Sequence, residues 1–154
     1  MSKSALLVDT NNLHYRVRKL YSKKLYYPHY LEKATKIAGG NIDEKIAYVT
    51  YIDNSVDGFV NNLENLGFTV ITHPPVKRIM FGRECRMYDW TPQLIVDALE
   101  AKHNGFDQII IGSSSFDLEP LLRAVDCTIF AAGLTTTAKE LCDKFVQITS
   151  RMLC

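Results

Sequence analysis

Three aspartates occupy positions where a catalytic cluster can be assembled. Asp9 ends the apolar run SALLVD, and Asp117 follows the apolar run QIII and a turn of small residues. Asp97 lies in the helical pattern that precedes that second run. If these carboxylates converge, they form a set of hard oxygen ligands suited to Mg²⁺ or Mn²⁺. Asp143 is a more distant candidate neighbour.

Each of these residues also has an ordinary structural role. Asp9 is placed to cap a following helix, and Asp117 to interact with a helix dipole from the first turn. Asp97 fits a solvated helix position equally well. Asn12 either orients a phosphate or a metal-bound water, or forms an Asx turn at a helix start.

The elements that must position these residues alternate between strand and helix. We expect strands at residues 4–9, 45–52, 68–72, 108–111 and 127–132. Helices are expected at residues 11–21, 31–38, 58–66, 91–104, 116–125 and 138–145. A charged loop or hairpin around Gly82 spans residues 76–90, and residues 146–153 form a short strand or a terminal helix. This alternation predicts a mostly parallel sheet with helices on both faces. Ligands of such sheets bind beyond the carboxyl ends of the strands, where Asp9 and Asp117 fall.

Length and composition predict one α/β domain over residues 1–154, with 47% apolar residues and a net charge of +1. Basic residues nevertheless gather in two segments. Residues 1–36 carry eight Lys and Arg against two acids, and residues 76–88 carry four against one. Such asymmetry is typical either of an anion-binding surface or of solvated faces. The nucleic-acid-binding candidates are Arg16, Arg18, Lys19, Lys77, Arg78, Arg83 and Arg86.

Aromatic residues accompany the first basic segment. Tyr15, Tyr21, Tyr26, Tyr27 and Tyr30 are placed either to stack on bases of single-stranded RNA or to pack at the edge of the core. Trp90 is expected to be a buried plug under the charged loop rather than a stacking platform.

Several functional classes are disfavoured. The cysteines form no CxxC pair and there is no His-x-x-x-His motif, which argues against structural zinc. The first strand has no GxGxxG turn of the kind that binds dinucleotides. There is no signal peptide, and no apolar run approaches the roughly 18 residues of a membrane span. We therefore expect a cytoplasmic protein.

The ordered motifs resemble the NYN domain family of the PIN-like nuclease superfamily. They are VDTNNL at residues 8–13, LIVDAL at 94–99, IIGSSSFDLEPL at 110–121 and LCDKFVQI at 141–148. The resemblance implies a PIN-like (Rossmannoid) three-layer α/β domain. It also implies Mg²⁺- or Mn²⁺-dependent hydrolysis of RNA, with Asp9, Asp97 and Asp117 as metal ligands and Asn12 as a further catalytic residue.

Two departures from the family pattern bear on activity. Thr91 and Ser115 stand at positions where the family usually carries acids, although Asp89 and Glu119 lie near enough to substitute. Loss of carboxylates weakens the binding of hard cations. We therefore expect weak cleavage of RNA. The alternative is an NYN fold that only binds nucleic acid or serves as a protein-interaction module.

Overall fold

The computed structural model describes residues 2–133 and 144–154, apart from the side chains of Met80 and Arg86. Its centre is a parallel sheet in the order β3-β2-β1-β6-β7-β8. The strands are β1 (Ser4–Asp9), β2 (Glu44–Thr50), β3 (Thr69–His73), β6 (Gln108–Gly112), β7 (Thr128–Ala131) and β8 (Phe145–Gln147). The expected mostly parallel α/β sheet is therefore confirmed.

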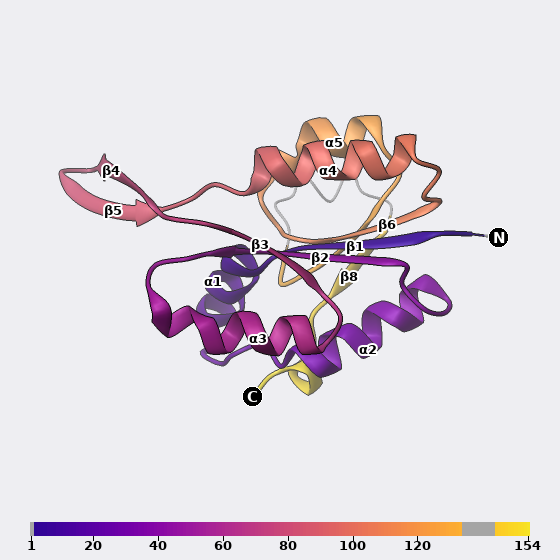
Figure 1. Cartoon of the computed structure of the whole chain (residues 1–154), viewed down its shortest axis with the longest axis horizontal. Helices are drawn as coiled ribbons and strands as arrows, with labels where there is room; N and C mark the ends of the chain where they lie inside the picture. The colour runs from indigo at the N-terminus through magenta and orange to yellow at the C-terminus, as the bar shows by residue number, and fades with distance from the viewer. Residues whose placement is uncertain (1, 134–143) are drawn as a thin grey trace.

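Helices cover both faces of this sheet (Figure 1). One face carries α1 (Thr10–Tyr21), α2 (Tyr27–Ala38) and α3 (Asp57–Asn65), which follows the single turn η1 (Asn54–Val56). The other carries α4 (Thr91–His103) and α5 (Glu119–Ala124), which follows the turn η2 (Phe116–Leu118). The sheet is thus the middle of three layers, and its side chains meet helices above and below it.

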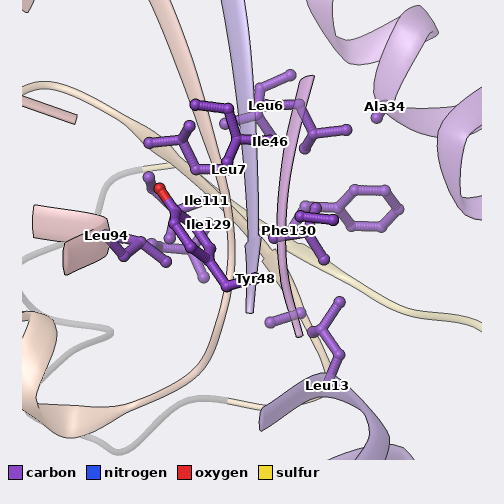
Figure 2. Close-up of a cluster of buried hydrophobic side chains, with 14 of the residues drawn as sticks. Leu6, Leu7, Leu13, Ala34, Ile46, Tyr48, Leu94, Ile111, Ile129 and Phe130 are labelled. Carbon is purple, nitrogen blue, oxygen red and sulfur yellow. The ribbon is translucent and has the colours of Figure 1, made fainter. Parts of the chain in front are cut away.

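The core lies on both sides of the two central strands. Leu6 and Leu7 of β1 point to opposite faces, because neighbouring strand residues alternate. Both are buried, as are Ile111 of β6 and Phe130 of β7 (Figure 2). Burial on both faces explains why these strands read as continuous apolar runs rather than alternating ones.

Strand order reverses at β1, and this reversal creates the place for a site. β1 pairs with β2 on one side and with β6 on the other. The connection after β1 therefore leaves toward one half of the sheet, while the connection after β6 leaves toward the other. Such a switch point opens a crevice at the carboxyl ends of the two strands.

Helix α2 begins earlier than expected. It starts at Tyr27 rather than at residue 31, with Pro28 in its first turn. A proline is well tolerated there, because the first-turn N–H groups have no partner within the helix. Tyr30 consequently packs in the core, stacked on Phe130 with ring centroids 4.2 Å apart, and is not available for stacking on a base.

The second half of the chain contains further differences. The charged segment forms an antiparallel hairpin of β4 (Val76–Met80) and β5 (Arg83–Met87). Phe145, expected in a helix at 138–145, belongs to strand β8, while residues 138–143 of that expectation lie outside the described residues. The chain then forms the short turn η3 (Ser150–Met152). Within the described residues, every helix is too short or too polar to cross a membrane.

Candidate active site

A cleft of about 860 Å³ opens at the switch point, beyond the carboxyl ends of β1 and β6. Four segments build its walls: the start of α1, the base of the β4–β5 hairpin, the start of α4 and the turn η2. Three carboxylates line it, those of Asp9, Asp89 and Asp117. The cleft therefore joins residues that are far apart in the chain.

Asp9 is the buried acid of this cleft, with only 6% of its surface exposed. As the N-cap residue of α1, it accepts a hydrogen bond from the backbone N–H of Asn12 at 3.1 Å. Burial and, to a smaller degree, the negative charge of Asp89 raise the pKa of Asp9 to about 6, against the lowering effect of that hydrogen bond. Asp9 thus both caps the helix and carries a perturbed carboxylate, a combination typical of functional sites.

Asn12 links the two strands that flank the switch point. Its side-chain oxygen accepts hydrogen bonds from the backbone N–H of Ser114 at 2.9 Å and from the Ser114 hydroxyl at 3.3 Å. A backbone N–H can only donate, so the oxygen of the amide must face Ser114. The amide nitrogen of Asn12 is left as a donor for a ligand in the cleft.

Asp89 fixes the start of α4 beside Asp9. Its carboxylate accepts a hydrogen bond from the backbone N–H of Thr91 at 3.1 Å. Thr91 is the first helical residue, as the expected helix over residues 91–104 has it, and Trp90 is the N-cap. Trp90 is 2% exposed and donates from Nε1 to the Thr50 hydroxyl at 3.1 Å, which confirms that its indole is a plug. In the sequence, Asp89 can be recognised as an acid that lies two residues before the Thr91-Pro92 start of a helix.

The other two predicted acids occupy different surroundings. Asp117 is exposed at the edge of the cleft, where its backbone N–H donates to the Ser115 hydroxyl at 3.3 Å. Asp97 is not among the described residues that line the cleft. Its carboxylate accepts hydrogen bonds from the Tyr48 hydroxyl at 2.7 Å and from the Gln93 amide at 3.0 Å. Burial and this bond to Asp97 raise the pKa of Tyr48.

The described side chains do not form a closed metal cage. Within residues 2–133 and 144–154 there is no group of three or more His, Cys, Asp or Glu side chains that is arranged to hold an ion. Glu119, a possible substitute acid, is instead paired with Arg123 at 2.7 Å. Asp143 lies outside the described residues. Among the described residues, the carboxylates of the cleft therefore do not enclose a metal-ion site.

The basic residues from the N-terminal segment are spread around α1. Tyr15 lines the cleft, and the Lys19 ammonium lies 5.8 Å from the centroid of its ring. Arg16 points toward Gly133, and its Nε is buried without a hydrogen-bond partner among the described residues. Arg18 is exposed and is not among the described residues that line the cleft. Among the described residues, none of these basic side chains lines the cleft, and Lys19 is connected to it through the ring of Tyr15.

The second basic segment borders the cleft directly. Arg78 lines it, together with Val76 and Met87 from the base of the hairpin. Lys77 lies on the opposite face of the hairpin and pairs with Glu84 at 3.2 Å. Arg83 is exposed farther along, and the Arg86 side chain lies outside the described part of the chain.

A second cavity, of about 680 Å³, adjoins the cleft at Asn11. Residues of α1, α2 and α3 line it, among them Tyr27 and Phe59, whose rings lie 5.5 Å apart. Asn11 separates the two spaces and donates a hydrogen bond to the Thr50 hydroxyl. Sequence reasoning did not find this cavity, because it depends on how three helices pack.

Comparisons with known proteins agree with this architecture. The NYN domain profile matches residues 3–150. The fold is also similar to the crystal structure of a protein of unknown function from Vibrio parahaemolyticus, with a TM-score of 0.83 and 25% identity over 99% of this chain and 96% of that chain. No curated protein matches the sequence. Since the family match covers nearly the whole chain, this protein belongs to the NYN domain family and has the nuclease-type fold of the PIN-like superfamily.

Proposed function

We propose that the protein hydrolyses phosphodiester bonds of single-stranded RNA in the switch-point cleft, with help from a divalent metal ion. The observation that carries this proposal is the buried Asp9 carboxylate, held beside Asp89 in a cleft that also contains Arg78. Carboxylates and a guanidinium that line one cleft match a phosphodiester and the ion that accompanies it.

The donor set fits a weakly held metal ion. The charge of Asp89 raises the pKa of Asp9, so the two carboxylates repel each other, and a divalent cation between them would relieve that repulsion. Mg²⁺ commonly keeps several water ligands and needs only one or two carboxylates together with a substrate phosphate. Asp9 and Asp89 would hold the ion, with Asp117 at the cleft edge. A bound Mg²⁺ or Mn²⁺ supplies an activated water and stabilises negative charge on the phosphate.

The protein's own groups position the strand. The Asn12 amide nitrogen donates toward a phosphate oxygen, because its oxygen is fixed by Ser114. Arg78 neutralises a neighbouring phosphate, and the exposed ring of Tyr15 offers a face for one base. We assign Asp97 a positioning role, because it is not among the described residues that line the cleft and its carboxylate accepts hydrogen bonds from Tyr48 and Gln93.

A second candidate function has its own supporting observation. The described carboxylates of the cleft do not enclose a metal-ion site, and Thr91 and Ser115 stand where the family usually carries carboxylates. A protein with these features can bind RNA, or a protein partner, through the same fold without cleaving anything. Cleavage and binding must therefore be measured separately.

The test incubates labelled single-stranded RNA with purified protein and Mn²⁺. Asp9→Asn keeps the shape of the side chain but removes its charge, so cleavage should be lost while RNA binding is retained. Ser115→Asp adds a carboxylate beside Asp117 and should increase cleavage at low Mn²⁺. Glu100→Gln on the exposed part of α4 is the matched control and should cleave like the wild type.

Two results would overturn the proposal. Equal cleavage by the wild type and Asp9→Asn would place the activity at another site or in a contaminant. Absence of cleavage in the wild type and in Ser115→Asp, with RNA binding intact, would establish the binding function instead.

A further inference from the structure

The β4–β5 hairpin stands clear of the three layers and projects on the side of the molecule where α4 begins (Figure 1). Within the described part of the chain, its two strands pair with each other and with no other strand, as a separate sheet. An isolated two-stranded hairpin is only marginally stable in water. Its base belongs to the cleft through Val76, Arg78 and Met87.

The two faces of this hairpin carry different residues. Residues paired across an antiparallel ladder share a face, and every second residue along a strand does so too. The register Val76↔Met87 and Arg78↔Cys85 therefore places Arg78, Arg83 and Cys85 on the face that leads into the cleft. Neither arginine forms an ion pair with a described residue. The opposite face carries the Lys77–Glu84 pair.

The tip of the hairpin holds a residue that neither packing nor turn chemistry explains. Phe81 is 99% exposed and has a φ of 54°, and Gly82 follows with a φ of 74°. Tight hairpin turns with two positive φ values favour Asn-Gly, because a bulky side chain is strained there. Both the exposure of the phenyl ring and the strain of its backbone are unfavourable. Residues with a strained backbone cluster at functional sites.

We propose that this hairpin is an arm that holds the RNA strand where it leaves the cleft. Arg78 and Arg83 contact successive phosphates, and the Phe81 ring stacks on an unpaired base. The inference rests on the proposed function, because it takes RNA as the ligand of the cleft. Two observations select a nucleic acid as the occupant: the arginine face continues directly from the cleft, and the ring lies at its far end.

The length of the arm sets which RNAs can use it. A strand rises about 3.3 Å per residue, so Phe81 lies roughly 16 Å from Val76 at the edge of the cleft. A dinucleotide in the cleft cannot reach the ring. An oligonucleotide of about ten nucleotides spans both, which falls within the usual site sizes of single-strand binders.

The experiment measures affinity for both RNAs by fluorescence anisotropy, in EDTA so that cleavage does not intervene. Phe81→Ala should weaken binding of the longer RNA by about tenfold, the effect of removing one aromatic stacking partner. It should leave the dinucleotide unchanged. Ile79→Ala on the opposite face, where Ile79 is 82% exposed, is the matched control and should change neither.

A second variant separates the ring from the stability of the turn. Phe81→Asn fits the left-handed backbone better and should strengthen the hairpin, yet it removes the ring and should bind as weakly as Phe81→Ala. Phe81→Trp should bind at least as tightly as the wild type, and its fluorescence should be quenched by RNA.

The outcomes also separate this inference from the function on which it rests. If the wild type binds the longer RNA and Phe81→Ala binds it equally well, the arm proposal is wrong while the proposed function stands. If the wild type neither binds the longer RNA in EDTA nor cleaves it in Mn²⁺, both are wrong, and a protein ligand for the arm becomes the next proposal. Weak binding by Phe81→Ala but not by Phe81→Asn would show that Phe81 acts only on the turn.

Discussion

The carboxylate of Asp9 is held where its protonated form is favoured. Its pKa is raised from 3.8 to about 6, chiefly by burial. Between roughly pH 4 and pH 6 the folded state therefore binds more protons than the unfolded state, and its stability falls as the pH rises through this window. Two pKa units correspond to about 3 kcal/mol, which is the cost of the ionised carboxylate at neutral pH in the absence of a bound cation.

Asp9→Asn should therefore stabilise the metal-free protein. The amide oxygen can still accept the hydrogen bond from Asn12, and the buried charge is gone, so the free energy of unfolding at pH 7 should rise by about 1–3 kcal/mol. Urea denaturation in EDTA at several pH values measures this, and the slope between pH 4 and pH 6 should flatten. Asp117→Asn, at an exposed position, should change stability by less than about 0.5 kcal/mol. A loss of stability in Asp9→Asn would mean that its carboxylate serves mainly as a helix cap.

Tyr48, a residue that is 0% exposed, donates a part-buried hydrogen bond of 2.7 Å from its hydroxyl to the Asp97 carboxylate. Tyr48→Phe should cost about 2 kcal/mol, because hydrogen bonds to charged groups are worth roughly 1.5–3 kcal/mol. Thermal unfolding measures this change. The matched control is Tyr51→Phe, which removes a 2.7 Å bond to Asp57 on the exposed surface and should cost much less. Equal losses in the two variants would contradict the buried role of the Tyr48–Asp97 pair.

Strand β6 has no room for a larger residue at Gly112. A Cβ on Gly112 would lie 2.6 Å from the Tyr30 hydroxyl, 3.1 Å from Val8 Cγ2 and 3.3 Å from Val8 Cα. Tyr30 cannot move aside easily, because its hydroxyl donates to the Phe130 carbonyl at 2.8 Å. The glycine therefore lets α2 approach the sheet at the strand end where the site begins.

Gly112→Ala should destabilise the protein by about 1–3 kcal/mol, the usual cost of overpacking. Gly58→Ala on α3 is the matched control, since no atom lies within 4 Å of its Cβ position and the helix gains a better former. That substitution should stabilise by about 0.5–1 kcal/mol. Calorimetric unfolding of the two variants decides the matter, and a neutral Gly112→Ala would show that α2 can shift away from β6.

For the whole molecule, the net charge of +1 gives little general attraction to RNA, so binding should depend on the few cations at the cleft and the arm. Each phosphate contact to a single strand contributes about −0.7 to the slope of log affinity against log salt. Replacing both Arg78 and Arg83 by Ala should therefore reduce that slope by about 1.4. Replacing both Arg16 and Arg18 by Ala should change it little, because neither is among the described residues that line the cleft. A larger reduction of the slope in the Arg16/Arg18 variant than in the Arg78/Arg83 variant would show that the RNA runs along α1 instead.

The sequence by itself determined the order of elements and the fold class, because apolar runs and helical periodicity are local signals. It also placed Asp9, Asn12 and Asp117 at the ends of the right strands. Local pattern was insufficient at Phe145, which belongs to a strand, and at Pro28, which lies inside the first turn of a helix. Both outcomes depend on what the segment packs against.

Only the tertiary structure decided which side chains share a space. It joined Asn12 to Ser114 across 102 residues, brought Asp89 beside Asp9, and turned Asp97 toward Tyr48. It also gave the charged segment 76–88 a projecting hairpin with a cationic face and an exposed Phe81 at its tip. The physical reason is that burial, carboxylate repulsion and hydrogen-bond partners are properties of atoms close in space, and sequence spacing fixes such closeness only within a single helix or strand.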